Sequence, residues 1–427
     1  MKINVFWIRR DIRLMDNVGF SQALKSDLPV LPIFIFDKQI LDELPEDDAR
    51  VNFIHDELSG MNDSLQKDGK GIRGYYGNPT ECLEQLLKEF EVNALYTNRD
   101  YEPYALNRDK KVAEFLSAKN VDFLTFKDQV IFEKSEVTKD DGKPYTVYTP
   151  FKNKWLSHFD ESPMIQDYQL TIENCLEGKF KFPSLNEMGF TKSSIKVRPI
   201  DLSQLDNYEE TRNFPATDGT SYLGPHLRFG TVSVRSIIRK LKQKDEVFLS
   251  ELIWREFFMQ ILYHFPHVVS NNFRAKYDGI KWRNNQEEFK KWCEGKTGYP
   301  LVDAGMRQLN KTGYMHNRVR MVTASFLCKH LLIDWKWGEA YFAQKLLDYE
   351  LASNNGNWQW SAGTGCDASP YFRVFNPESQ LTKFDKKMTY VQQWAPEYSE
   401  LIFPQPMVEH KFARERAIAT YKEGIES

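Results

Sequence analysis

The segment ELIWREFF at residues 251–258 places a carboxylate beside aromatic side chains. On a helix, Glu251, Trp254 and Phe258 lie on one face, at spacings i, i+3 and i+7. An aromatic stripe at this spacing usually packs into a core. A carboxylate buried without a partner, however, costs several kcal/mol. Glu251 therefore needs a buried donor, a ligand or solvent.

A second segment, GYMHNRVRMVTASF at residues 313–326, combines an amide, a thioether and two guanidinium groups. On a helix, Asn317 and Met321 share a face, with Arg318 and Arg320 beside them. An amide offers acceptor and donor atoms that suit the edge of a planar heterocycle or base. A helix N-terminus with a solvated basic flank explains the same residues and, for this segment alone, is the simpler interpretation.

A third segment, residues 346–377, has an unusual mixture of acids, amides, tryptophans and glycines. Within 13 residues it contains Asp348, Glu350, Asn354, Asn355, Trp358 and Trp360. Glycines at positions 356, 363 and 365 allow close backbone approach. Such a mixture makes a poor core but a good lining for a large flat ligand with polar edges.

A fourth segment, TDGTSYLGPHLRFGTVS at residues 217–233, has two hydroxyl side chains after a glycine. Thr220 and Ser221 precede an expected helix, and a helix N-terminus can bind phosphate. A simple helix N-cap is the commoner explanation of such a string. Both interpretations stay open from the residues alone.

The elements that must position these segments differ along the chain. Strand-like runs at 4–9, 30–36, 71–76, 93–97 and 121–126 alternate with helix-period stretches, which predicts a five-stranded parallel sheet covered on both faces. No G-x-G-x-x-G follows the first strand, so a dinucleotide bound in the NAD fashion is disfavoured. After residue 200 almost every signal is helical. We predict a Rossmann-like α/β domain over 1–130, a long connector over 131–200 and an all-α domain over 201–427.

Composition excludes several classes of protein. With 427 residues, 41% hydrophobic and 27% charged, the chain is an ordinary globular protein. The longest apolar runs fall short of the ~20 residues of a membrane span, and the N-terminus lacks a signal-peptide pattern, so we expect a cytoplasmic protein. Five cysteines far apart predict reduced thiols and no zinc site. Residues 1–150 carry net charge −7 and the rest +4, which leaves room for a basic face.

The residues of these segments, and the order in which they follow one another, resemble those of the DNA photolyase and cryptochrome family. The resemblance rests on FWIRRDIRLMDN, YTPFKNKW, DGTSYLGPHLRFG, ELIWREFF, WCEGKTGYPLVDAGMRQLNKTGYMHNRVRM and NNGNWQWSAGTGCDASPYFRVFNP. It covers nearly the whole chain and is strongest to class I cyclobutane pyrimidine dimer photolyases. It implies an antenna-type α/β domain followed by a helical domain that binds FAD and DNA.

The resemblance also assigns cofactor-binding residues. Those implied at the FAD phosphates and ribityl chain are Tyr208, Thr220, Ser221, Tyr222, Leu223 and Gly224. Those implied at the flavin and its ribityl chain are Asn317, Asp348, Tyr349, Glu350 and Asn354. Gly224 stands where the family usually has a serine, which removes one hydroxyl. A second, light-harvesting chromophore is common in the family, and here folate and deazaflavin both stay open.

Pocket residues place the chain within the family. Trp254 resembles the aromatic that stacks on the dimer, and Glu251 the acid that bonds to its carbonyls. Asn317 and Met321 stand where (6-4) photolyases carry histidine, and Asn354 matches the photolyase amide near flavin N5. The implied catalytic residues are Glu251, Trp254, Asn317, Met321, Asn354 and Trp360. The prediction is light-driven repair of cyclobutane dimers; the alternatives are a non-repairing cryptochrome-type photoreceptor and, less favoured, a (6-4) photolyase.

By the same resemblance, excited reduced FAD donates an electron that splits the flipped-out dimer, so neither a catalytic triad nor a metal is expected. Tryptophans Trp358, Trp335 and Trp282 match the family's electron relay, in order from flavin to solvent. The predicted partner is UV-damaged DNA, bound by a monomer. Its contacts are predicted at Arg212, Glu251, Trp254, Arg255, Phe258, Asn317, Arg318, Arg320, Gln380 and Lys383.

Overall fold

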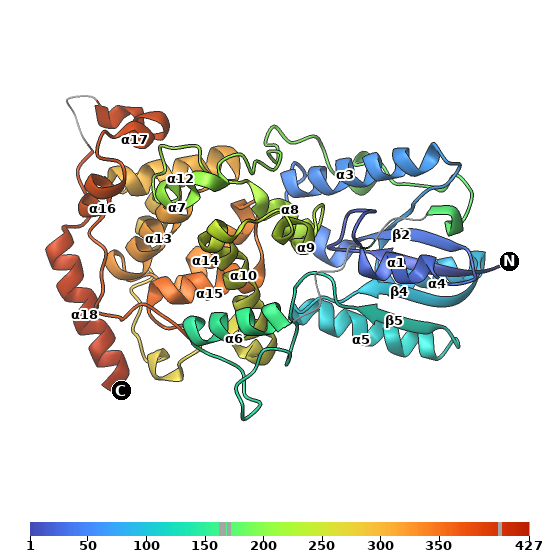
Figure 1. The fold of residues 1–427 in the computed structure, drawn as a ribbon. Coiled ribbons are helices and arrows are strands. Elements are labelled where there is room, and N and C mark those ends of the chain that lie inside the picture. Colours follow the sequence, from blue (N-terminus) through green and yellow to red (C-terminus); the bar gives the residue numbers. More distant parts are fainter. Residues whose placement is uncertain (162–167, 169–171, 400–403, 427) are drawn as a thin grey trace. The chain divides into compact units, whose positions relative to one another are not determined.

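The computed structural model describes residues 1–161, 168, 172–399 and 404–426, which form two compact units (Figure 1). The sheet unit consists of residues 1–136, 157–200 and 223–242, and the helical unit of residues 137–156, 201–222 and 243–427. The chain therefore passes between the units several times. The sequence predicted three consecutive regions, 1–130, 131–200 and 201–427, and these bounds stay a prediction. The two compact units are built from alternating segments of the chain.

The sheet unit contains five parallel strands in the order β3-β2-β1-β4-β5. The strands are β1 Lys2–Ile8, β2 Val30–Asp37, β3 Arg73–Gly77, β4 Glu91–Asn98 and β5 Asp122–Phe126. Strand β2 is buried along its whole length, as expected of a parallel sheet with both faces covered. The five strands predicted from the sequence and the α/β class are confirmed.

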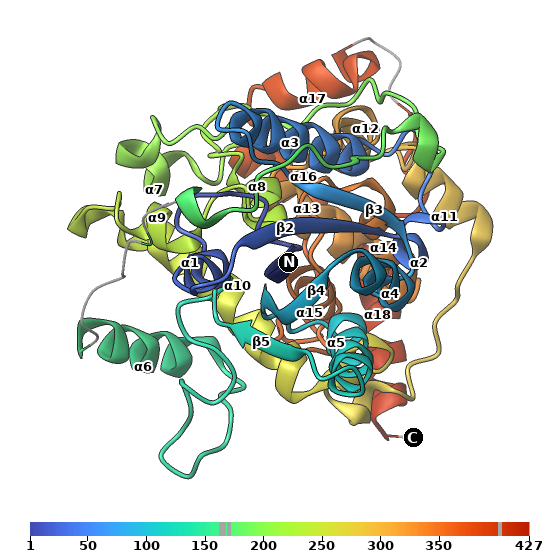
Figure 2. The same cartoon turned by 90° about the vertical axis from the view of Figure 1, so that its right-hand side faces the viewer.

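Helices cover the two faces of this sheet (Figure 2). One face packs against α1 Val18–Leu24 and α3 Ala49–Gln66, and the other against α4 Pro79–Glu89 and α5 Pro103–Ser117. Val5 and Phe6 of β1 belong to the two different hydrophobic clusters, because successive strand residues point to opposite faces. Short helices α2 Lys38–Leu41, α8 Leu223–Phe229 and α9 Val234–Ile238 complete the unit.

The helical unit, in its described part, contains helices and irregular segments packed around a large hydrophobic core and a smaller cluster. Its helices are α7 Tyr208–Thr211, α10 Glu246–His264, α11 Gln286–Cys293, α12 Pro300–Thr312, α13 Asn317–Ser325, α14 Trp335–Lys345, α15 Leu351–Ala362, α16 Pro377–Phe384, α17 Thr389–Trp394 and α18 His410–Glu426. Helix α6, Tyr148–Glu161, has residues in both units. Trp292, Trp335 and Trp358 are buried in the core, and the predicted helical class is confirmed. Within the described residues, no helix has the length and apolarity required to cross a bilayer.

Helices α10 and α15 both carry residues of the predicted site, and they approach closely at a glycine. A Cβ atom on Gly356 of α15 would lie 2.1 Å from Cδ1 of Phe258 on α10. We therefore expect Gly356→Ala to lower the free energy of unfolding by about 1–3 kcal/mol, because inserting a methyl group into a packed core strains it. Urea denaturation of the purified protein measures the change.

Gly60→Ala is the matched control for this prediction. Gly60 lies within α3, and a Cβ there would meet nothing within 4 Å. Alanine is the better helix former by about 0.5–1 kcal/mol, so this variant should be as stable as the wild type or slightly more so. Equal stability of the two variants would contradict the tight packing at Gly356.

Candidate functional site

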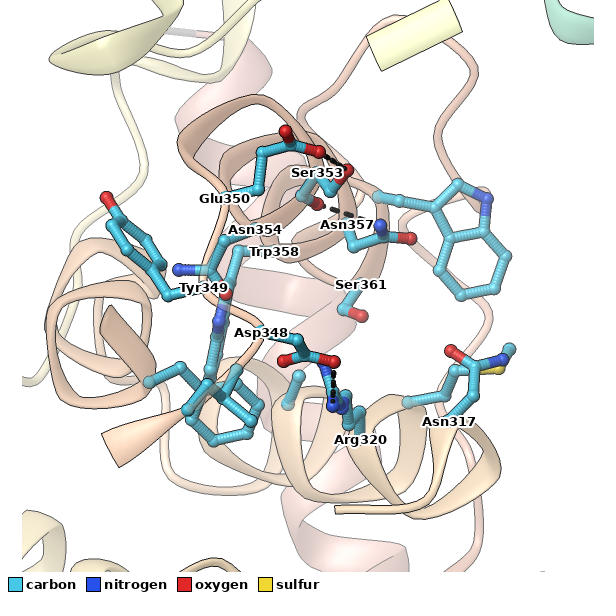
Figure 3. A pocket seen from close by; sticks show the side chains of 15 residues that line it. Asn317, Arg320, Asp348, Tyr349, Glu350, Ser353, Asn354, Asn357, Trp358 and Ser361 are labelled. Atoms are coloured by element: carbon cyan, nitrogen blue, oxygen red, sulfur yellow. Dashed lines mark hydrogen bonds and ion pairs between the residues drawn. The ribbon is translucent and has the colours of Figure 1, made fainter. Parts of the chain in front are cut away.

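A pocket with about 580 Å³ of empty space, part of which is open to solvent, lies between α13, α14 and α15 of the helical unit (Figure 3). It is lined by Asn317, Arg320, Met321, Ala324, Phe342, Leu346, Asp348, Tyr349, Glu350, Ser353, Asn354, Asn357, Trp358, Trp360 and Ser361. The lining comes mainly from residues 317–324 and 346–361. Two of the four segments singled out in the sequence therefore meet at one cavity.

The cavity wall includes the Asp348 carboxylate, one oxygen of which has no hydrogen-bond partner among the described residues. Arg320 donates from Nη2 to Oδ2 of Asp348 at 2.8 Å and from Nε to the carbonyl of Met315 at 2.8 Å. Oδ1 of Asp348 is buried and has no hydrogen-bond partner among the described residues. A buried acceptor without a partner is costly. This wall is therefore built to receive an N–H or O–H group of a ligand.

A neutral amide of the cavity wall pairs with a half-buried acid behind it. Asn354, which is 9% exposed, donates from Nδ2 to the carbonyl of Glu339 at 3.1 Å and to its Oε1 at 2.9 Å. Burial raises the pKa of Glu339, although the Asn354 bond opposes it. Glu339 lies on α14 behind the cavity wall, outside the lining residues. In the sequence, Glu339 follows Trp335 by four residues, so the two share a helix face. This spacing could have identified Glu339 as a residue near the site.

The three tryptophans of the predicted relay differ in burial. Trp358 lines the cavity and is 2% exposed, with its ring centroid 4.9 Å from that of Phe342. Trp335 is buried and donates from Nε1 to Asn272 at 2.9 Å. Trp282 is only partly buried. Trp282, the residue expected next to solvent, is thus the least buried of the three, and the relay itself stays a prediction.

On α10, Trp254 stacks on an aromatic ring from another segment. The ring of Tyr148 is 3.6 Å away and inclined by 8°, and the Tyr148 hydroxyl donates to the carbonyl of Ser250 at 2.7 Å. One face of Trp254 is therefore covered by a fixed partner. Phe258, predicted among the DNA contacts, is 5% exposed and lies against Gly356, so the structure places it between two helices.

Glu251, one turn before Trp254, forms an ion pair with Arg212. Nη1 of Arg212 lies 2.6 Å from Oε1 of Glu251, and the two side chains are 30% and 34% exposed. Burial raises the pKa of Glu251, while the charges of Arg212 and Lys152 act in the opposite direction. The partner that the sequence required for this acid is thus Arg212, a residue predicted to bind DNA.

A second ion pair connects α10 to the start of α15. Nε of Arg255 lies 3.2 Å from Oε2 of Glu350, which lines the cavity, and both side chains are largely buried. Arg255, also predicted as a DNA contact, is thus placed where it holds Glu350 in position.

Three arginines form a basic cluster, defined here as Arg212, Arg318 and Arg373. Arg318 donates from Nη2 to Asn213 at 2.6 Å and lies 4.3 Å over the ring of Phe384. Burial, followed by the charges of Arg212 and Arg373, lowers the pKa of Arg318. Such crowding of like charge favours an anionic ligand.

The sequence analysis overlooked Arg373 of this cluster. Arg373 lies in the motif PYFRVFNP, which could have indicated it as a DNA contact. Two further predicted DNA contacts, Gln380 and Lys383, lie on α16 beside Phe384, the residue under the Arg318 guanidinium.

The predicted phosphate turn falls where the chain passes from one unit to the other. Thr220, Ser221 and Tyr222 end a segment of the helical unit, while Leu223 and Gly224 begin α8 of the sheet unit. Tyr222 has a positive φ of 53°, an uncommon conformation that clusters at ligand-binding turns. Tyr208 lies in the helical unit, with its ring centroid 5.1 Å from that of Phe248.

Comparison with known protein families gives two matches. Residues 4–167 match the family described as DNA photolyase, and residues 248–402 match the FAD binding domain of DNA photolyase. A curated protein from Synechococcus sp., named deoxyribodipyrimidine photo-lyase, is 35% identical over 98% of this chain and 96% of its own length.

Two solved structures are similar over their whole length. A class III photolyase from Agrobacterium tumefaciens superposes with a TM-score of 0.87 at 34% identity, covering 100% of this chain and 98% of its own. A photolyase from Sulfolobus tokodaii, described as containing two FAD molecules, gives a TM-score of 0.83 at 32% identity, covering 99% of this chain and 100% of its own.

Proposed function

Because the chain belongs to the DNA photolyase family, we infer that it is a deoxyribodipyrimidine photo-lyase, an enzyme that uses light to split cyclobutane pyrimidine dimers in DNA. One observation carries this inference. Asn317, Met321, Asn354 and Trp360, four of the six predicted catalytic residues, line the same cavity as Asp348, Tyr349 and Glu350. Residues chosen for dimer chemistry and residues chosen for the cofactor therefore share one site.

The residues of the cavity fit FAD. The free Oδ1 of Asp348 can accept a hydrogen bond from a ring N–H or a ribityl hydroxyl. The Asn354 amide can adjust to a flavin nitrogen with or without a proton, because an amide carries no charge. We assign Asn317, Asp348, Tyr349, Glu350 and Asn354 to holding the cofactor. Reduced FAD, when bound, supplies on absorbing blue light the electron that opens the dimer and then takes it back.

Residues of this chain are proposed to stack on the dimer, to donate a hydrogen bond to it and to bind the phosphates beside it. The damaged nucleotides must leave the duplex, which costs a few kcal/mol. Trp254 and Trp360 are proposed to stack on them, at about 1–3 kcal/mol for each base. Glu251 in its protonated form donates to a dimer carbonyl, where negative charge develops during splitting. The basic cluster, together with Lys383, binds backbone phosphates of the strand.

The (6-4) alternative would need a pair of histidines that move protons. Asn317 and Met321 line the cavity where such a pair would stand. The neighbouring His316 is the N-cap of α13 and accepts from the N–H of Arg318 at 3.1 Å. Burial, aided by Arg320 and Arg318, lowers the pKa of His316 to about 4. It therefore stays neutral at pH 7, which disfavours (6-4) repair.

We further propose that the sheet unit takes a second chromophore, as the Sulfolobus tokodaii photolyase with two FAD molecules suggests. Folate, deazaflavin and a second flavin are the candidates. A cytoplasmic monomer with access to cellular DNA is the form proposed for the enzyme.

Dimer reversal under blue light tests the function. Reduced holoenzyme is incubated with an oligonucleotide that carries one thymine cyclobutane dimer, and loss of the dimer is followed in light and in darkness. We expect reversal only in light, and none of a (6-4) lesion under the same conditions. A holoenzyme that leaves the dimer intact in light would instead support the photoreceptor alternative.

A further inference from the structure

The ion pair between Glu251 and Arg212 is incompatible with the role proposed for Glu251 in repair, which is to donate a hydrogen bond to a dimer carbonyl. The pair is short, at 2.6 Å, and an acid paired with a guanidinium is ionised. An ionised carboxylate only accepts hydrogen bonds, and so does the carbonyl oxygen of a pyrimidine dimer. The ionised state that pairing with Arg212 favours is therefore the wrong one for contact with the dimer.

Arg212 has an alternative partner once DNA is present. It belongs to the basic cluster, where the charges of Arg212 and Arg373 already oppose that of Arg318. Nε of Arg318 is buried and has no hydrogen-bond partner among the described residues. A strand phosphate would relieve this repulsion, and guanidinium groups bind phosphate well. Arg212 is 30% exposed, so its side chain has room to turn.

The other groups that face Glu251 would not keep it ionised. They are Tyr208 of α7 and Tyr148 and Lys152 of α6. Burial raises the pKa of both phenols above the usual range, so both are neutral at pH 7. Without Arg212, Lys152 is the one group among the described residues whose charge opposes the effect of burial, and a dimer stacked on Trp254 would bury Glu251 further.

We propose that binding of dimer-containing DNA moves Arg212 from Glu251 to a backbone phosphate, and that Glu251 then takes one proton from solvent. This rests on the proposed function and adds a role for Arg212, which positions the proton on Glu251 as well as binding DNA. Charge balances at the site, because the new phosphate contact replaces the carboxylate at Arg212.

The experiment is to count protons on binding, in the dark, with the holoenzyme. Isothermal titration calorimetry at pH 7 in phosphate and in Tris buffer gives the number taken up from the difference in apparent enthalpy. We expect about one proton for an oligonucleotide with one dimer and about none for its undamaged counterpart. Affinity for the dimer should then weaken as pH rises above 7, by at most about tenfold per pH unit.

Two variants and a control make the result specific. Glu251→Gln should bind the dimer with no proton uptake and no slope with pH. Arg212→Gln should take up fewer protons than the wild type at pH 7, because Glu251 is partly protonated before DNA arrives. Glu287→Gln removes a carboxylate from the exposed side of α11 and should behave as the wild type.

The outcomes separate the two proposals. Wild-type enzyme that repairs the dimer in light but takes up no proton overturns the exchange at Arg212 and leaves the function standing. Proton uptake that persists in Glu251→Gln also overturns it, because another group would then be titrating. Protein that neither binds nor repairs the dimer overturns the proposed function itself.

Discussion

Trp254→Ala should weaken dark binding of dimer-containing DNA by about 5–150-fold, the equivalent of about 1–3 kcal/mol for one lost base stack. Tyr148 stacks on one face of the Trp254 ring at 3.6 Å, so the ring is held in place before the lesion arrives. A side chain held in this way loses little entropy on binding. Most of the stacking free energy therefore contributes to the binding free energy. Fluorescence anisotropy with a labelled oligonucleotide measures the change.

Two comparisons show whether the lost affinity comes from stacking. Trp254→Phe keeps an aromatic face and should lose only a few-fold in affinity. Undamaged DNA, which presents no flipped nucleotide, should bind both variants as it binds the wild type. If Trp254→Ala bound the dimer as tightly as the wild type, Trp254 would belong to the core and the proposed dimer pocket would be misplaced.

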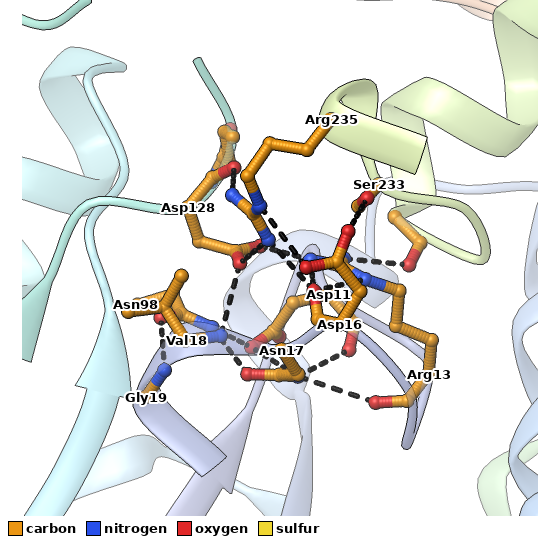
Figure 4. Close-up of polar contacts among 12 residues, drawn as sticks. Asp11, Arg13, Asp16, Asn17, Val18, Gly19, Asn98, Asp128, Ser233 and Arg235 are labelled. Carbon is orange, nitrogen blue, oxygen red and sulfur yellow. Dashed lines mark hydrogen bonds and ion pairs between the residues drawn. The ribbon is translucent and has the colours of Figure 1, made fainter. Parts of the chain in front are cut away.

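The second large effect concerns a buried ion network in the sheet unit (Figure 4). Arg235 donates to Oδ1 of Asp128 at 2.8 Å and to Oδ1 of Asp16 at 3.1 Å. It also donates to the carbonyls of these two residues, at 2.9 and 2.7 Å. Arg13 reaches the other oxygen of Asp128 at 2.5 Å. Asp128 is 1% exposed, so its charge depends on these two arginines.

Arg235→Met should lower the free energy of unfolding by about 3–5 kcal/mol at pH 7, because it removes one of the two arginine partners of each buried carboxylate. Asp128 then keeps only its pair with Arg13, and Asp16 its pair with Arg239. Arg73→Met is the matched control. Arg73 pairs with Glu89 at 2.8 Å, and these side chains are 21% and 41% exposed, so the expected loss is about 0–1 kcal/mol. Urea denaturation compares the two variants, and a loss as small for Arg235→Met as for Arg73→Met would contradict the structural role of the network.

The pH dependence has a definite sign. Burial alone would raise the pKa of Asp128, but Arg13 and Arg235 outweigh it and hold the pKa below its ordinary value. In the wild type this carboxylate therefore stabilises the fold above the unfolded-state pKa of ~3.9, and its contribution is lost as pH falls toward the folded-state value. In Arg235→Met the pKa of Asp128 should rise. The difference in stability between variant and wild type should then widen as pH increases from 5 to 7.

Much of the fold could be predicted because strands and helices leave local patterns. The alternation that predicted the sheet comes from β-rich runs such as residues 30–36, which are buried on both faces as β2. The helical class followed from stretches with helical period, among them the segment that forms α10. Neither pattern shows where the chain crosses between units, since that depends on contacts such as those of Arg235 with Asp16, 219 residues away.

The cavity could be predicted in part for the same reason. Asn317, Met321, Asn354 and Trp360 lie in segments whose composition is unusual for a core, and they meet at one cavity. Glu339 was overlooked because its proximity to Asn354 arises only when α14 packs on α15. The pairing of Arg212 with Glu251 was overlooked too, although both residues were predicted individually, because a spacing along the chain does not show which charges meet.

The alternating course of the chain bears on how the protein is made. The sheet unit includes Ser233 and Arg235, which bond to Asp16. At about 5–20 residues per second, a ribosome needs on the order of 12–50 s to reach residue 242, where the last segment of that unit ends. Until then Asp16 lacks its pairs with Arg235 and Arg239, and Asp128 has only its pair with Arg13. A truncation after residue 200 would leave the sheet permanently in that state, so an isolated sheet unit would have to be expressed with residues 223–242 supplied.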